Sequence, residues 1–282
     1  MTGLNHLVLA ANNLVAIRSL YENLGFTLTA TGQHPFGTGN TIIQLHGTYL
    51  ELLAITRPQD VVEHTTGTFS FSAFNRDYLQ RHEGFAMMVL DSEDAASDIA
   101  KWRAKSLQTY APFEFSRTAR MPDGEDVTVG FSLAFVSHPA APWLGHFACQ
   151  HYRPEYYAQP QYLSHPNGAY GVKDIWISGG GALELADHFA TVTGRLPRSD
   201  APGRIEIATP HGDIVLATVE EFQHAFGVFP PHPQDGPHLA ALTIACTSLD
   251  RLPTDSMTQV RGRRIVPPSA GFGTAIAFCL RE

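Results

Sequence analysis

The chain has 282 residues, of which 44% are hydrophobic and 16% are charged, so it can bury a large core in one or two domains. Its formal net charge of −8 lacks the basic excess that is typical of a nucleic-acid-binding protein. The three cysteines form no CxxC pair, which argues against a disulfide framework or a zinc-thiolate site. With no signal-peptide pattern and no apolar run of membrane-spanning length, we expect a cytoplasmic protein.

The first 55 residues predict one strand, one helix and three further strands. A strand pattern covers residues 4–11, and apolar residues at helical spacing cover residues 13–24. Asn13 is the expected N-cap of this helix, and Gly25 is its expected stop. Strand-like stretches follow at 26–31, 41–45 and 49–55, with turn residues between them. This order defines a βαβββ unit.

The βαβββ order recurs three more times along the chain. The second unit is expected at 85–90 (strand), Asp91 or Ser92 to about Lys105 (helix), and 113–119, 127–136 and 146–152 (strands). The third is expected at 171–178 (strand), 183–192 (helix, ending at Gly194), and 204–208 and 213–217 (strands). The fourth is expected at 238–245 (strand), a short helix near Leu249, and 264–266 and 274–280 (strands). Segments 58–84 and 153–170 show neither periodicity and are predicted to be irregular.

A single unit of this kind leaves one face of its sheet uncovered, so two units must pair and curl around a shared cavity. We therefore predict an α+β protein of four βαβββ units, paired into two curved-sheet half-barrels. The expected divisions are an N-terminal paired domain at 1–152, a connector at 153–170 and a C-terminal paired domain at 171–282. Phenylalanine and tyrosine residues in the two irregular segments favour a small, aromatic or apolar substrate.

His6 and Glu51 are the leading candidate site residues. His6 is the one imidazole in an apolar predicted strand, and Glu51 is the one carboxylate in another. A buried carboxylate is costly unless it is paired or coordinates a metal. A histidine and a glutamate on neighbouring strands can supply two ligands of a divalent-metal site that keeps open positions for a substrate. The pair therefore predicts a metal centre inside the N-terminal domain.

The chain resembles the vicinal oxygen chelate superfamily, which includes glyoxalases and extradiol dioxygenases, and within it the glyoxalase-like domain branch. The resemblance rests on the histidine strand, the helix ending Tyr-Glu-Asn-Leu-Gly-Phe and the Tyr-Leu-Glu strand, in that order, and on the segments Glu83–Phe85, Phe147–His151 and His165–Ala169. It implies one divalent metal held by first and fourth strands of paired units. His6 and Glu51 match these two ligand positions.

The first strand of the second unit departs from the pattern of this superfamily. Its matching position falls at Ala86 or Phe85, and neither side chain can coordinate a metal. A third ligand would then come from the strand at 146–152. Strand alternation assigns His151 if Phe147 and Cys149 face the interior, and His146 or Gln150 if the register is reversed.

Other histidines are not assigned to a site. Eight of them fall in predicted loops or on polar helix faces without ligand spacing, namely His34, His64, His82, His138, His188, His211, His224 and His232.

The sequence favours a divalent-metal-dependent lyase, isomerase or ring-cleaving dioxygenase. Its metal would be Fe, Mn, Ni or Zn, held by His6, Glu51 and His151, with Glu51 also able to act as a base. A small-molecule substrate is the expected partner, with neither nucleic acid nor a membrane, and a homodimer is a possible assembly. Two alternatives stay open: a metal-free protein of the same fold that sequesters a small ligand, which Ala86 supports, and a structural role with a filled barrel.

Overall fold

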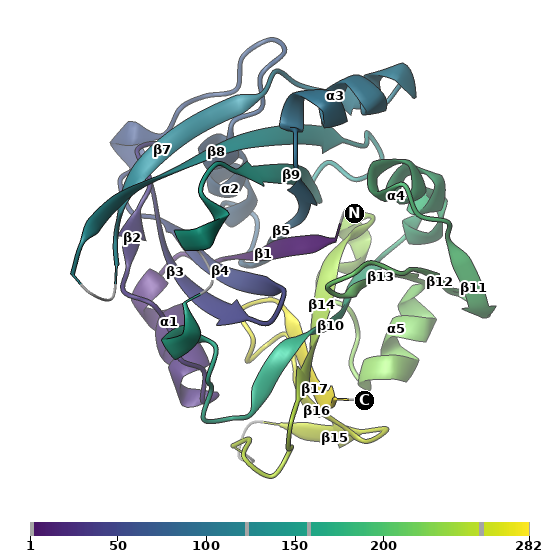
Figure 1. The fold of residues 1–282 in the computed structure, drawn as a ribbon. Helices are drawn as coiled ribbons and strands as arrows, with labels where there is room; N and C mark the ends of the chain where they lie inside the picture. The colour runs from purple at the N-terminus through teal and green to yellow at the C-terminus, as the bar shows by residue number, and fades with distance from the viewer. Residues whose placement is uncertain (1–2, 122–123, 157–158, 254–256, 282) are drawn as a thin grey trace.

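Two curved β-sheets lie against each other (Figure 1). The computed structural model describes residues 3–121, 124–156, 159–253 and 257–281. Within these ranges one sheet has nine strands, in the order β2-β3-β4-β1-β5-β9-β8-β6 with β7 paired to β8. The other has eight strands, in the order β11-β12-β13-β10-β14-β17-β16-β15.

Each sheet is built from two consecutive units. The first unit comprises β1 (Leu4–Ala10), α1 (Leu14–Asn23), β2 (Gly32–Gln33), β3 (Thr38–Leu45) and β4 (Thr48–Ile55). The second comprises β5 (Gly84–Ser92), α3 (Ala95–Ala104), β6 (Gln108–Thr109), β7 (Phe113–Arg120), β8 (Asp126–Ser137) and β9 (Gly145–His151). The third comprises β10 (Ala169–Ser178), η4 (Ala182–Leu185), α4 (Ala186–Thr193), β11 (Arg198–Ala201), β12 (Arg204–Ile207) and β13 (Asp213–Ala217). The fourth comprises β14 (His238–Cys246), β15 (Thr258–Val260), β16 (Arg263–Val266) and β17 (Ala275–Leu280).

The first strands of consecutive units pair at the centre of each sheet. Strands β1 and β5 run antiparallel, and so do β10 and β14, while the first and last strands within each unit run parallel. The predicted α+β fold of paired βαβββ units is therefore confirmed. The domain boundaries at 152 and 171 stay a prediction.

Several predicted elements differ from the structure. Residues 26–31 form no strand, and only β2 precedes β3. The segment 58–84 contains η1 (Pro58–Asp60) and the helix α2 (Phe71–Leu79), which Ser70 caps by accepting from the Ala73 N–H. The sequence did not predict α2, and it also did not predict the helix α5 (Val219–Phe226), which lies between β13 and β14. Because these helices are about two turns long, their apolar spacing is too short to stand out in the sequence.

The fourth unit lacks its predicted helix in the described part of the segment between β14 and β15. A turn forms near Leu249 instead, in which the Leu252 N–H donates to the Leu249 carbonyl oxygen. Pro253 follows directly, and a proline disfavours helical geometry in the residue before it. The helix is consequently replaced by a tight connection. The connector contains two more short turns, η2 (Pro154–Tyr156) and η3 (Pro160–Tyr162).

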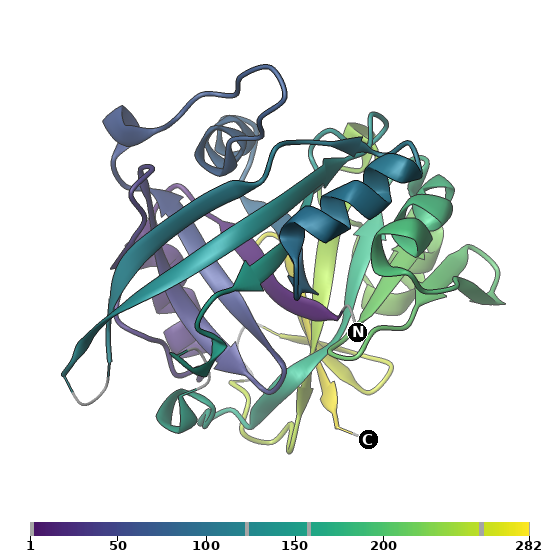
Figure 2. The ribbon, with the colours of Figure 1, turned by 45° about the horizontal axis from the view of Figure 1, so that its top comes forward.

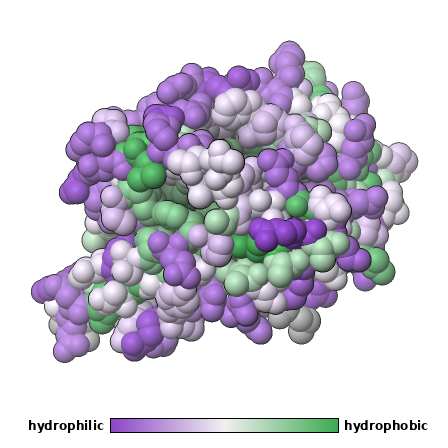
Figure 3. Space-filling model, turned by 90° about the horizontal axis from the view of Figure 1, so that it is seen from above, coloured by the Kyte–Doolittle hydropathy of each residue, from purple (hydrophilic) through white to green (hydrophobic). Residues whose placement is uncertain are grey.

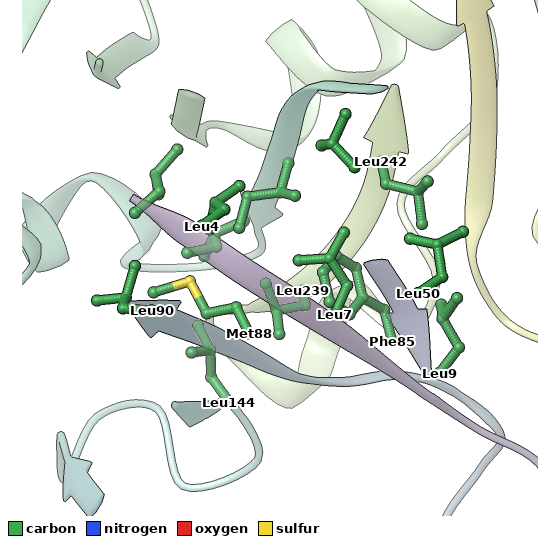
Figure 4. Packing of buried hydrophobic residues seen from close by; sticks show 14 of the residues in the cluster. Leu4, Leu7, Leu9, Leu50, Phe85, Met88, Leu90, Leu144, Leu239 and Leu242 are labelled. Carbon is green, nitrogen blue, oxygen red and sulfur yellow. The ribbon is translucent and has the colours of Figure 1, made fainter. Parts of the chain in front are cut away.

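Strand β1 is apolar because both of its faces are buried. Val8 and Ala10 face the concave side of the first sheet, whereas Leu7 and Leu9 face the second sheet. Figure 4 shows Leu7 close to Leu239 of β14, with residues of β4 and β5 around them. This cluster contains residues from both sheets, so the two halves of the chain share one core.

The helices and aromatic residues give the two concave faces different contents. Helix α3 packs on β8 and β9, and the long strands β7 and β8 run side by side away from it (Figure 2). In the second sheet the concave face is filled by Trp176 together with Phe222 and Phe226 of α5. The ring centroids of Trp176 and Phe226 lie 5.1 Å apart. The concave face of the first sheet surrounds a cavity that carries ionisable side chains.

Gly194, at the end of α4, has a left-handed backbone with φ 68°. We expect Gly194→Ala to lower the free energy of unfolding by about 1 kcal/mol, because a Cβ in this region is strained. The Cβ would meet no atom within 4 Å, so packing adds nothing to this cost. Gly180→Ala is the control, since its Cβ also meets open space but its φ is not in the positive range. Equal urea-unfolding curves for the two variants would contradict the prediction.

Hydrophilic residues cover most of the face seen from above, and a band of apolar residues crosses its middle (Figure 3). Among the helices of the described ranges, none is both long enough and apolar enough to cross a membrane.

Candidate active site

A cavity of about 40 Å³ lies inside the concave face of the first sheet. Strands of both units line it, so it belongs to the pair and not to either unit alone. Its polar side chains are His6, His34, Asn40, Glu51 and Arg117. Phe36, Phe71, Phe115, Phe131 and Phe147 supply most of its apolar wall. The cavity thus holds a small cluster of ionisable side chains that is surrounded by phenylalanine rings.

His6 and Glu51 meet in this cavity. They lie on the neighbouring parallel strands β1 and β4, where Glu51 is in register with Val8. Their side chains project to the same face, and His6 Nε2 lies 3.7 Å from Glu51 Oε2. Each residue is only 5% exposed, so water screens neither of them well. The structure therefore brings together the two residues that stood out in the sequence.

The hydrogen bonds of Asn5 fix the proton on His6. The Asn5 side-chain nitrogen donates to Asp91 Oδ1 at 2.7 Å, so the Asn5 oxygen is the acceptor at 2.6 Å from His6 Nδ1. A neutral His6 then carries its proton on Nδ1 and presents the lone pair of Nε2 to the Glu51 carboxylate. Burial, with smaller contributions from His151 and His34, holds the pKa of His6 well below its usual value. The Tyr49 ring, stacked at 4.4 Å, keeps the imidazole in place.

His34 is the second imidazole beside Glu51, and it was not assigned to a site from the sequence. Its Nε2 lies 3.7 Å from Glu51 Oε1, and its Nδ1 lies 2.8 Å from Thr38 Oγ1. Burial, aided by the charge of Arg117, lowers the pKa of His34 to about 3, so the ring is neutral at pH 7. His34 follows β2, a strand of two residues, and nothing in its local sequence signals burial. The hairpin from β2 to β3 carries it into the cavity.

Glu51 is the carboxylate on which the polar groups of the cavity converge. Asn40 Nδ2 donates to Glu51 Oε1 at 2.6 Å. Burial raises the pKa of Glu51 to about 7, although the Asn40 hydrogen bond and the Arg117 charge act in the opposite direction. A carboxyl group with this pKa can gain or lose a proton near neutral pH. Asn40 could have been suspected from strand alternation, because β3 pairs Ile42 with Glu51 and places Asn40 and Ile42 on one face.

His151 faces the same side of β9 as Phe147 and Cys149, but it does not reach Glu51. Its Nε2 lies 3.2 Å from Asn5 Oδ1, so His6 and His151 share one acceptor. His151 lines a neighbouring, more open cavity of about 460 Å³, which shares Tyr49 and Cys149 with the small one. His151 is thus linked to His6 through Asn5.

The alternatives His146 and Gln150 lie on the opposite face of β9. His146 Nε2 is 2.6 Å from His188 Nε2, and the Gln150 side-chain oxygen accepts from the Ala95 N–H. Neither residue lines the small cavity. The structure therefore places His34, and none of the three residues considered on this strand, beside the carboxylate.

The donor set of the cavity fits a divalent metal ion. Two imidazoles and one carboxylate are the ligand types of sites that leave coordination positions open for a substrate. The Nε2 lone pair of His6 faces a carboxylate oxygen without a hydrogen atom between them, unless Glu51 is protonated. Either a cation or a proton must lie there to offset the repulsion. His6, Glu51 and His34 are the residues that could hold the cation.

Comparisons with known proteins agree on the fold. The sequence matches the family model described as "Glyoxalase-like domain" over residues 4–193. A hypothetical protein from Staphylococcus aureus has a similar structure, with a TM-score of 0.74, 11% identity and coverage of 99% of both chains. A mutant of 4-hydroxymandelate synthase from Streptomyces coelicolor gives a TM-score of 0.56 at 12% identity, over 100% of this chain and 95% of that one. No curated protein matches the sequence. At these identities the structural likeness shows the fold alone.

Proposed function

The chain belongs to the glyoxalase-like domain family of the vicinal oxygen chelate superfamily, and on that premise we propose that the small cavity is the active site of a divalent-metal-dependent enzyme. The observation that carries the proposal is the buried Glu51 carboxylate with the Nε2 atoms of His6 and His34 each 3.7 Å from one of its oxygens. Fe, Mn, Ni and Zn all accept such a ligand set. When bound, the ion would polarise two vicinal oxygens of a substrate and stabilise negative charge that develops on them.

Glu51 is the proposed proton-transfer group. Its carboxylate lines the cavity, where it can take a proton from a substrate carbon and return it. Asn40 holds the carboxyl group in one orientation through its hydrogen bond. Because this chemistry moves a proton, it supports an isomerase or lyase more directly than a ring-cleaving dioxygenase.

Arg117 is the proposed binding residue for an anionic group of the substrate. It lines the cavity from β7, and its Nε is buried without a hydrogen-bond partner among the described residues. A guanidinium group donates well to a carboxylate. The substrate would then carry a carboxylate or another anionic oxygen beside the reacting atoms.

The two neighbouring cavities, which share Tyr49 and Cys149, suggest how a substrate would lie. The small cavity has space for little more than the reacting atoms, whereas the adjoining cavity of about 460 Å³ can hold the rest of a small molecule. The phenylalanine wall favours an aromatic or apolar body close to the reacting end. We therefore propose a small anionic substrate with an apolar portion and two neighbouring oxygens.

Metal analysis tests this proposal. Protein purified without chelator and supplied in turn with Fe, Mn, Ni and Zn is expected to bind one more equivalent than His6→Ala or Glu51→Ala. His64→Ala, at an exposed position outside the cavity, is the matched control and should retain the wild-type content. Equal metal content in the wild type and all three variants would contradict the proposal. It would favour a metal-free ligand-binding protein, in which a protonated Glu51 donates to His6 Nε2.

A further inference from the structure

A second group of potential ligands lies where the two halves of the chain meet. His82 lies between α2 and β5, and His232 and Asp235 lie between α5 and β14, with Asp235 in the turn η5 (Pro233–Asp235). One ligand atom from each of the three lies within 4.8 Å of the others. None of them lines the cavity of Glu51. We propose that His82, His232 and Asp235 bind a divalent metal ion that clasps the N-terminal half to the C-terminal half.

The His82 and Asp235 side chains already have the spacing of two ligands on one ion. His82 Nδ1 lies 3.3 Å from the Glu83 carbonyl oxygen, which can only accept, so the proton of a neutral ring is on Nδ1. The lone pair of Nε2 then faces Asp235 Oδ2 at 3.3 Å. Two ligands bound at about 2.0–2.1 Å to a tetrahedral ion are themselves about 3.3 Å apart. A backbone carbonyl on the far nitrogen is also the usual support of a metal-binding histidine.

The surrounding side chains hold two of the three ligands in place. Arg81 Nη2 lies 3.1 Å from Asp235 Oδ1, which leaves Oδ2 for the ion, and the Arg81 guanidinium lies 4.6 Å over the Trp143 ring. The His82 ring packs edge-on against Tyr78 at 4.6 Å. Asp235 and His82 are therefore oriented before any ion binds.

His232 completes the group from the solvent side. Its ring is stacked on His82, with centroids 4.0 Å apart and planes 11° apart. His232 is exposed, so the ion has a route of entry and the ring can turn toward it. Its backbone is left-handed, with φ 47° between Pro231 and Pro233, a region in which histidine and asparagine are both more common than most other residues.

The charges of the site select the class of metal. The positive charge of Arg81 repels a cation that is held by electrostatic attraction alone. The site also offers only one carboxylate among its three proposed ligands. Ca²⁺ and Mg²⁺ require several oxygen ligands, whereas Zn²⁺ and Ni²⁺ bind imidazole strongly. The ion is therefore of the zinc or nickel kind, and its role is to tie the two sheets together.

Zinc titration of the intact, metal-free protein tests this clasp. Wild-type protein is expected to bind one more equivalent of Zn²⁺ in equilibrium dialysis than His232→Asn or Asp235→Asn, and to gain several degrees more in thermal-unfolding midpoint on adding zinc. Asparagine at 232 keeps a residue that tolerates the left-handed backbone, so His232→Asn is expected to fold. His224→Ala, at an exposed position on α5, is the control and should behave as the wild type.

The inference is overturned if folded His232→Asn and Asp235→Asn bind as much zinc as the wild type, or gain as much in melting temperature. The group would then be an ion pair between His82 and Asp235 and nothing more. Glu51→Ala separates this site from the candidate active site, because it leaves the clasp intact. If Glu51→Ala binds less zinc than the wild type but His232→Asn binds the same amount, the result supports the active-site metal and refutes the clasp.

Discussion

Replacing Glu51 with glutamine is expected to make the metal-free protein gain stability relative to the wild type as the pH rises from 5 to 8. The pKa of Glu51 is raised from 4.5 to about 7 in the folded protein, chiefly by burial. The folded state therefore binds more protons than the unfolded state between these values. The stability contributed by the neutral carboxyl group is complete below pH 4.5 and is lost as the pH rises through 7. Over the interval from pH 5 to pH 8 the difference is about 2–3 kcal/mol.

Glutamine is a close match for the protonated carboxyl group. Its amide oxygen can accept from Asn40, and its amide nitrogen can donate to the Nε2 lone pair of His6. Urea unfolding of chelated wild type and Glu51→Gln at pH 5 and pH 8 measures the effect. Subtracting the two proteins at each pH removes the contributions of the buried histidines, which both proteins share. Glu184→Gln, at an exposed position, should show no such pH-dependent difference. A constant difference between wild type and Glu51→Gln would show that Glu51 ionises normally.

The fold was predictable because its signals are local. The apolar run of β1, the Asn13 cap of α1 and the Gly194 stop of α4 each record a requirement of the nearby backbone, and the structure shows all three. Because the βαβββ order recurs along the chain, the pairing of consecutive units could then be predicted. The helices α2 and α5 were missed because an eight- or nine-residue helix gives too few repeats of its apolar spacing.

The candidate site was only partly predictable because burial depends on the tertiary structure. His6 and Glu51 stood out since each interrupts an apolar strand, and strands keep their faces in register. His34 and Arg117 lie in polar or irregular sequence, and they reach the cavity only when the hairpins β2–β3 and β7–β8 fold over it. The same reason hid His82 and His232, which are 150 residues apart in the chain and meet only when the halves dock.

The residue that completes the proposed metal centre can be identified by comparing His34→Ala with His151→Ala. We expect His34→Ala to weaken metal binding about 100-fold, because the roughly 10–16 kcal/mol of a four-ligand zinc site corresponds to about 3 kcal/mol for each ligand. His34 Nε2 lies beside Glu51, so its loss removes a donor and leaves space. His151 instead shares the Asn5 oxygen with His6, so its loss would disturb only the support of a ligand.

His151→Ala is accordingly expected to weaken metal binding by about 10-fold, the lower end of the range for residues that support ligands. Competition with a chromogenic chelator measures both affinities, and circular dichroism verifies that each variant is folded. The reverse order of effects would make His151 the third ligand and require its ring to turn from Asn5 toward Glu51 when the metal binds. Because the two histidines lie in different cavities that meet at Tyr49 and Cys149, the outcome also decides which cavity receives the reacting end of the substrate.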